Sequence, residues 1–255
     1  MSEAEIRDKG RAAIAAWGGA LFAIFLASPP AFVSAQSLLP SMQEPLRPAQ
    51  RLARIPENAV RSETTSTAFF VNGSGYLLTA RHAVERCARV IVAKEGWAVE
   101  AKVVAQSPEA DLALVKAPRT LGLNAVFPRT VAVSPSELVF ASAFDTLPGK
   151  LIGSGLMANA VVRADSSVDA LAIESDVTFG ASGAPVLDGR GLVQGVISRR
   201  TAANRVVAIG AHAVKSFLYA HNVRFDQDDR AQIAGNGSRA HRAASISARI
   251  RCLQN

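Results

Sequence analysis

The chain has 255 residues, of which 49% are hydrophobic and 19% are charged. This balance excludes an intrinsically disordered protein, because enough apolar surface is present to offset the entropy lost on folding. Two cysteines form at most one internal bridge, which excludes a small fold held together by several disulfides. The net charge of +7 raises the question of a nucleic-acid partner.

Residues 1–35 have the layout of a secretory signal peptide. Basic residues precede an uncharged apolar run at 12–27, and prolines and small residues follow it up to Ala35. The run is shorter than the about 20 residues that a membrane span needs. We expect export with cleavage after Ala35, and no stable membrane insertion once the peptide is removed. An uncleaved anchor is the alternative, because three acidic residues weaken the basic start.

The next segments differ in pattern. Residues 36–60 carry four prolines without periodicity, and we expect a lead-in without regular structure. From residue 61 onward, short apolar runs alternate with Gly-, Asn- and Asp-containing turns, which is typical of an all-β barrel or sandwich. Strands are expected at Ala68–Val71, Tyr76–Thr79, Val90–Ala93, Leu112–Lys116, Val131–Val133, Ala160–Val162, Leu171–Ile173, Pro185–Leu187, Leu192–Ser198 and Val206–Ile209.

The C-terminal part contains one expected helix and a basic segment. Val214–Asn222 has apolar residues at helical spacing. Residues 226–255 contain several arginines, and no acid occurs from residue 230 onward, which is typical of a solvated basic tail. No helix-turn-helix, zinc-finger or aromatic RNA-binding motif accompanies this tail, so we expect no nucleic-acid partner.

Three polar residues stand at the ends of expected strands. His82 ends the motif T-A-R-H, Asp111 begins D-L-A-L-V, and Ser182 lies in G-x-S-G-x-P-V. Each alone is ordinary for a turn or a strand end. Their order and their separations of 29 and 71 residues are together more specific. On these motifs the chain resembles the trypsin-like (chymotrypsin-fold) serine peptidases, particularly the bacterial exported branch, over about residues 62–222.

The resemblance implies an all-β fold of two packed six-stranded antiparallel β-barrels with a C-terminal helix, spanning residues 61–225. It implies a serine endopeptidase without a PDZ domain, in the bacterial periplasm or secreted, acting on proteins or peptides without a cofactor. Ser182 would attack the peptide bond and form an acyl-enzyme, His82 would act as base and Asp111 would orient the imidazole. The N–H groups of Gly180 and Ser182 would form the oxyanion hole.

Two positions depart from the family pattern. Ala184 replaces a glycine of G-x-S-G-G, and alanine costs about 1 kcal/mol if this position needs a positive φ. Ala181 stands where members activated by cleavage have an aspartate, so we expect no activation by an ion pair with a freed N-terminus. A catalytically weak or inactive chymotrypsin-fold binding protein is therefore the alternative function.

Substrate preference is indicated by few residues. Asp176 lies six residues before Ser182, where trypsin has the acid of its S1 pocket, and this placement predicts cleavage after Arg or Lys. A solvent-facing loop acid is the alternative, and Arg199 and Arg200 oppose a cationic substrate. Ser198, in the strand expected to pair with substrate, is the second substrate-binding candidate.

The two cysteines are candidates for a disulfide, and the three histidines other than His82 are tested for a metal site. Cys87 and Cys252 can form one disulfide in an oxidising compartment, and a buried free thiol at Cys87 is the alternative. His212, His221 and His241 lack zinc-ligand spacing with one another or with cysteine, so no metal site is expected.

Overall fold

The computed structural model of the protein describes residues 62–132, 134–152, 158–234 and 237–254, all within the unit Arg54–Asn255. The expected signal peptide (1–35) and lead-in (36–60) lie outside the described residues. Within those ranges, no helix is both long enough and apolar enough to cross a membrane.

Six strands close the first barrel, in the spatial order β1-β14-β3-β4-β5-β2. They are β1 (Glu63–Phe70), β2 (Tyr76–Thr79), β3 (Arg89–Lys94), β4 (Trp97–Gln106), β5 (Ala113–Lys116) and β14 (Ser247–Leu253). All neighbouring pairs are antiparallel. Alternate side chains point inward and form a buried core that includes Phe70, Val92 and Ile250.

The second six-stranded sheet has the order β10-β11-β12-β9-β8-β7. Its strands are β7 (Leu138–Val139), β8 (Ala160–Val162), β9 (Ala170–Ser175), β10 (Pro185–Leu187), β11 (Val193–Ala202) and β12 (Arg205–Gly210). Phe140 and Leu187 exchange two backbone hydrogen bonds of 2.8 Å, which bring the two edges of the sheet together. The predicted all-β fold of two six-stranded barrels is confirmed.

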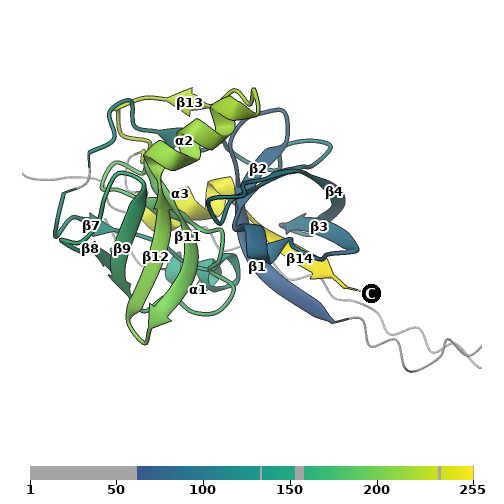
Figure 1. Ribbon diagram of the computed structural model, residues 1–255, viewed down its shortest axis with the longest axis horizontal. Helices are drawn as coiled ribbons and strands as arrows, with labels where there is room; N and C mark the ends of the chain where they lie inside the picture. Colours follow the sequence, from purple (N-terminus) through teal and green to yellow (C-terminus); the bar gives the residue numbers. More distant parts are fainter. Residues whose placement is uncertain (1–61, 133, 153–157, 235–236, 255) are drawn as a thin grey trace, which may run out of the picture. The chain divides into compact units, whose positions relative to one another are not determined.

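The other elements connect the barrels or cover them (Figure 1). They are η1 (Arg81–Ala83), β6 (Val126–Phe127), η2 (Phe144–Thr146), α1 (Leu147–Lys150), α2 (Ala211–Ala220), β13 (Asp226–Gln227) and α3 (Arg239–Ile246). α2 is the helix expected at Val214–Asn222, but it begins three residues earlier. A third core cluster joins side chains of both barrels to α2 and α3, among them Phe69, Phe140 and Leu218.

One expected strand is absent, and several strands formed where none was expected, β4 and β7 among them. Val131 and Ala132 are not in a strand, because this stretch lies in the connection before β7, and residue 133 lies outside the described part. β4 was not expected, because most of its side chains are exposed and Ala101 is its one buried residue. The period-two placement of Val99, Ala101 and Val103 was the available signal.

The segment 226–255 is expected as a solvated basic tail, but its last strand, β14, completes the first barrel. β14, yellow in Figure 1, lies between the blue strands β1 and β3. Its inward-facing residues are Ala248, Ile250 and Cys252. The intervening Arg249 and Arg251 form ion pairs of 2.6 Å with Asp145 and Glu63. The arginines are therefore the outer face of a strand, which compositional reasoning does not distinguish from a tail.

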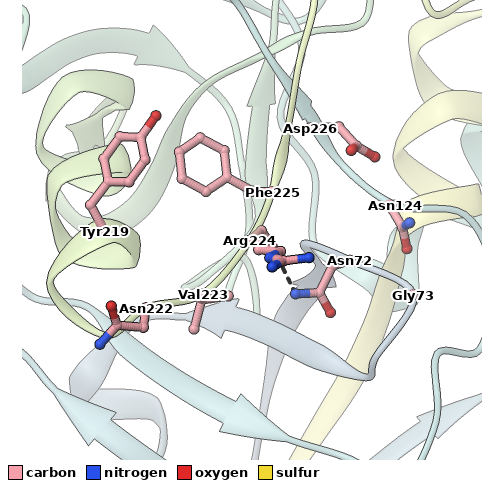
Figure 2. Close-up of a pocket in the computed structure, with 9 residues that line it drawn as sticks. All are labelled: Asn72, Gly73, Asn124, Tyr219, Asn222, Val223, Arg224, Phe225 and Asp226. Carbon is pink, nitrogen blue, oxygen red and sulfur yellow. Dashed lines mark hydrogen bonds between the residues drawn. The ribbon is translucent and has the colours of Figure 1, made fainter.

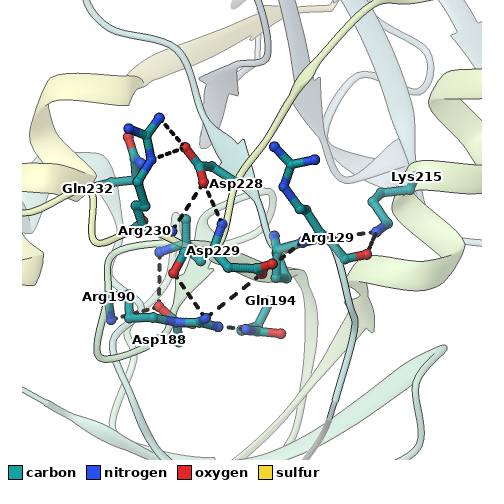
Figure 3. Close-up of polar contacts among 11 residues, drawn as sticks. Arg129, Asp188, Arg190, Gln194, Lys215, Asp228, Asp229, Arg230 and Gln232 are labelled. Carbon is teal, nitrogen blue, oxygen red and sulfur yellow. Dashed lines mark hydrogen bonds and ion pairs between the residues drawn. The ribbon is translucent and has the colours of Figure 1, made fainter.

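The connection that leads to α3 is also bonded to the fold (Figure 3). Arg190 donates to the buried carboxylate of Asp188 at 2.9 Å and to the carbonyl of Asp229 at 3.3 Å. The backbone N–H of Gln232 donates to the carbonyl of Arg190 at 2.7 Å. These contacts fasten residues 229–232 to the turn between β10 and β11.

Cys87 and Cys252 form a disulfide with a Cα–Cα distance of 5.2 Å. The bridge joins the segment between η1 and β3 to the penultimate residue of β14. The predicted pairing is confirmed, and neither cysteine is a free thiol.

Candidate active site

Both barrels contribute to the candidate site. The first places His82 in η1, which follows β2 after a single residue, and Asp111 in the turn before β5. The second places Ser182 in the turn before β10. Residues 100 positions apart in the chain therefore meet where the barrels face each other.

The side chains form a continuous hydrogen-bonded series. His82 Nδ1 lies 2.8 Å from Asp111 Oδ2, and His82 Nε2 lies 3.0 Å from Ser182 Oγ. The backbone N–H of His82 donates to Asp111 Oδ1 at 3.0 Å. Because an ionised carboxylate only accepts hydrogen bonds, Nδ1 carries the proton and Nε2 presents a lone pair to the Ser182 hydroxyl. The structure thus brings together the three residues named from the sequence.

The local electrostatics favour a charged Asp111 beside His82. Burial by itself raises the pKa of Asp111, but hydrogen bonds from His82 and Ser198 outweigh it and hold this pKa well below its usual range. The hydrogen bond to Asp111 raises the pKa of His82 above its ordinary value of 6.5. Asp111 therefore remains an anion that stabilises a protonated imidazole.

The two substrate-binding candidates lie in different environments. Ser198 is 3% exposed and donates to Asp111 Oδ2 at 2.6 Å, so its hydroxyl is engaged by the carboxylate. A substrate contact by Ser198 would have to come from its main chain. Asp176 is exposed directly after β9, and its role in substrate preference stays a prediction.

The turn around Ser182 depends on two glycines with positive φ. Gly180 and Gly183 both have φ of +84°. A Cβ on Gly183 would lie 2.1 Å from the carbonyl oxygen of Thr67 and 2.3 Å from the hydroxyl of Thr79. Only glycine fits this approach of the turn to the first barrel.

The two departures from the family pattern are alanines that lie in the apolar core of the second sheet, a cluster that also includes Leu171 and Ile173. Ala181 and Ala184 are both buried there. Among the described residues, Ala184 is not one of those with positive φ. The conformational freedom of glycine is therefore not needed at position 184, and the strain considered for alanine does not arise.

Sequence reasoning missed two residues that brace the site. Arg81 Nη1 donates to the carbonyls of Ser107 and Pro108, at 2.6 and 3.2 Å, in the loop that leads to Asp111. Its position beside His82 was the available signal. Thr67 contacts the Ser182 turn from β1, and no local pattern marks it, because the contact exists only once both barrels have folded.

A separate hollow of about 720 Å³ lies at the opposite end of β2 from His82 (Figure 2). It is open between the β1–β2 turn and the chain that follows α2, where the Asn72 side-chain amide donates to the carbonyl of Arg224 at 2.8 Å. The hollow is lined by none of the predicted site residues. The described ranges also contain no group of three or more His, Cys, Asp or Glu placed to hold a metal ion.

Similar proteins are known from sequence and from structure. The uncharacterized protein y4bJ of Sinorhizobium fredii is 25% identical over 213 residues, which cover 77% of this chain and 33% of that protein. The chain thus spans about a third of the length of this relative. The Rv3671c protease of M. tuberculosis, in an inactive form, has 24% identity and a TM-score of 0.49, covering 62% of this chain and 87% of its own.

The HtrA-type protease AlgW with a decapeptide has 19% identity and a TM-score of 0.52, covering 61% of this chain and 50% of its own, and the likeness concerns the fold alone. Residues 66–196, half of the chain, match the family model of the trypsin-like peptidase domain. With this match and the two-barrel fold in agreement, the chain belongs to the trypsin-like peptidase family.

Proposed function

We propose that the protein is a serine endopeptidase that hydrolyses peptide bonds with Ser182, His82 and Asp111. The observation that carries this proposal is the position of His82, with Nε2 at 3.0 Å from Ser182 Oγ and Nδ1 at 2.8 Å from Asp111 Oδ2. A serine hydroxyl is a weak nucleophile at neutral pH, and a base within hydrogen-bonding distance overcomes this weakness.

The proposed reaction has two halves. His82 accepts the Ser182 proton as Oγ bonds to the scissile carbonyl carbon, and the N–H groups of Gly180 and Ser182 stabilise the oxyanion. His82 then protonates the leaving amine as the C–N bond breaks, which leaves an acyl group on Ser182. Water then attacks this ester while His82 takes its proton. The C–Oγ bond breaks, His82 returns the proton to Ser182 Oγ, and the acid product leaves.

The alternative is a chymotrypsin-fold binding protein with little or no activity. Ala184 motivates it, because the family pattern has glycine there. The intact hydrogen-bonded series and the ordinary backbone conformation of Ala184 favour the peptidase.

The proposal includes export to the periplasm or the medium and, from Asp176, cleavage after Arg or Lys. Export is supported by the pattern of residues 1–35 and by the disulfide, because disulfides persist in oxidising compartments. N-terminal sequencing of the mature protein tests it, and a start before residue 12 contradicts cleavage. A peptide library tests the Asp176 assignment, which fails if neither Arg nor Lys is preferred at P1.

Labelling by a fluorophosphonate probe tests the reaction independently of substrate preference. The mature wild-type protein is compared with Ser182→Ala, His82→Ala and the control Ser216→Ala, an exposed serine on α2. We expect labelling of the wild type and of the control, none of Ser182→Ala, and strongly slowed labelling of His82→Ala. A folded wild-type protein without Ser182-dependent labelling supports the binding protein instead.

A further inference from the structure

Thr67 in β1 is fully buried and uses every polar atom it has. Its hydroxyl donates to the carbonyl of Gly180 at 2.7 Å and accepts the backbone N–H of Phe144 at 2.9 Å. Its own N–H donates to the carbonyl of Ser182 at 3.0 Å, and its carbonyl accepts the Thr79 hydroxyl at 2.7 Å. One residue of the first barrel thus holds two carbonyls of a turn in the second.

Of the two N–H groups assigned to the oxyanion, that of Ser182 lies between the two carbonyls held by Thr67, and that of Gly180 belongs to the same residue as the first of them. We call residues 180–182 the oxyanion segment. Fixing the carbonyls of Gly180 and Ser182 restricts rotation of the backbone between them. The direction of the hydroxyl bond is also determined, because the N–H of Phe144 occupies an acceptor site of Oγ1 and leaves the hydroxyl proton for Gly180.

Packing alone does not hold Gly180. A Cβ there would meet its nearest neighbours, Ala143 Cβ and the carbonyl of Thr65, at 3.7 and 4.0 Å, which is ordinary contact. A Cβ added to Gly183, by contrast, would lie only 2.1 Å from the carbonyl oxygen of Thr67, so the backbone around Gly183 is tightly confined. A glycine with free space can rotate, so hydrogen bonds orient it. The peptide unit between Gly180 and Ala181 is held by the Thr67 hydroxyl at 2.7 Å on its carbonyl side, and on its N–H side by a longer bond of 3.3 Å to the carbonyl of Thr178.

We propose that Thr67 is a positioning residue that holds the oxyanion segment in the orientation that receives the negative charge of the tetrahedral intermediate. The inference rests on the proposed function. It acts through the backbone of Gly180 and Ser182, and Thr67 itself does not touch substrate.

Three variants separate the hydroxyl from the rest of the side chain. Thr67→Val has nearly the same shape but lacks the hydroxyl, and Thr67→Ser keeps it. Ser66→Ala is the control. It removes a buried hydroxyl from the same strand, and this hydroxyl has no hydrogen-bond partner among the described residues. The measurements are kcat and KM on a p-nitrophenyl ester, their pH dependence, and the thermal unfolding midpoint.

Loss of one oxyanion donor lowers kcat by about 100- to 1,000-fold, and a displaced donor should have a smaller effect. For Thr67→Val we expect kcat to fall by about 10- to 100-fold with KM within about twofold, because the interaction is made in the transition state. Thr67→Ser should stay within about threefold of the wild type, and Ser66→Ala should be unchanged. The acid limb of the pH profile should keep its midpoint, because His82 is untouched.

A folded Thr67→Val with wild-type kcat overturns the proposal, as does a loss confined to KM or an equal loss in Ser66→Ala. If Thr67→Val does not fold, the smaller Thr67→Ala takes its place.

NMR of the wild type gives a second test, in which the Thr67 hydroxyl proton should be protected from exchange and close to the Phe144 amide. Rapid exchange overturns the proposal without any variant. An inactive wild type contradicts the proposed function, whereas an active wild type with an equally active Thr67→Val contradicts only the role of Thr67.

Discussion

Removal of the Cys87–Cys252 disulfide is expected to destabilise the first barrel. The bridge ties β14 to the segment that follows His82, and β14 pairs with both β1 and β3. Without the bridge, the unfolded chain regains the freedom of a loop with a sequence separation of 165 residues.

The loop length sets the magnitude. The chain-entropy relation gives a stabilisation of about 5 kcal/mol for a loop of this length at 25 °C. Measured losses for native bridges are commonly about 2–5 kcal/mol, so we expect a loss of about 3–5 kcal/mol in the free energy of unfolding. In a domain of this size each kcal/mol lowers Tm by about 2–4 °C, which gives a decrease of about 10 °C.

The assay is urea unfolding of the mature wild-type protein and of the double variant Cys87→Ala/Cys252→Ala. Trp97 in β4 reports on the first barrel, and the only other tryptophan, Trp17, lies in the expected signal peptide. Wild-type protein unfolded with a reductant is the matched control and should coincide with the double variant. Equal unfolding midpoints for the oxidised, reduced and cysteine-free proteins would refute the reasoning.

Three further predictions concern the catalytic base, a buried amine and the Ser182 turn. The pKa of His82 is raised above 6.5, and only the neutral imidazole accepts a proton. In a pH profile, kcat/KM should therefore rise with pH along a limb whose midpoint lies above 6.5. A midpoint below 6.5 contradicts this. The Lys94 ammonium donates to three carbonyls where α3 meets β14, and Lys94→Met leaves them without this donor. We expect the free energy of unfolding in urea to fall by about 2–4 kcal/mol. An unchanged urea unfolding midpoint contradicts this. Gly183→Ala should abolish fluorophosphonate labelling of Ser182, because the added methyl group would overlap the first barrel. Gly73→Ala is the control, since its added methyl group has nothing within 4 Å, and it should be labelled normally. Equal labelling of the two variants contradicts the packing argument.

Five of the six strands of the second barrel and the Ser182 turn could be predicted from the sequence, because the apolar runs and turn residues that mark them lie within a few positions of one another; the two-residue strand β7 could not. Pro185–Leu187 is a short apolar run beside a turn of small residues, and it forms β10 with the bounds expected. The same holds for Tyr76–Thr79, which ends just before His82. Buried strands of this kind are recognisable from their own side chains.

The completion of the first barrel was not accessible, because it depends on contacts between distant residues. Arg249 and Arg251 alternate with buried residues in β14, and their acidic partners lie more than 100 positions earlier in the chain. Net charge and composition therefore indicated a tail where the fold has a strand. Ser198 and Thr67 show the same limit within the site, since their partners come from other strands and turns.

Trapping the acyl-enzyme is the most direct test of the central claim that Ser182 is the nucleophile. Mature protein is mixed briefly with p-nitrophenyl acetate, quenched in acid, and analysed by intact and peptide mass spectrometry. We expect one acetyl group per molecule, located on Ser182 and absent from Ser182→Ala. A folded protein that gains no acetyl group, or gains one equally in Ser182→Ala, contradicts the account.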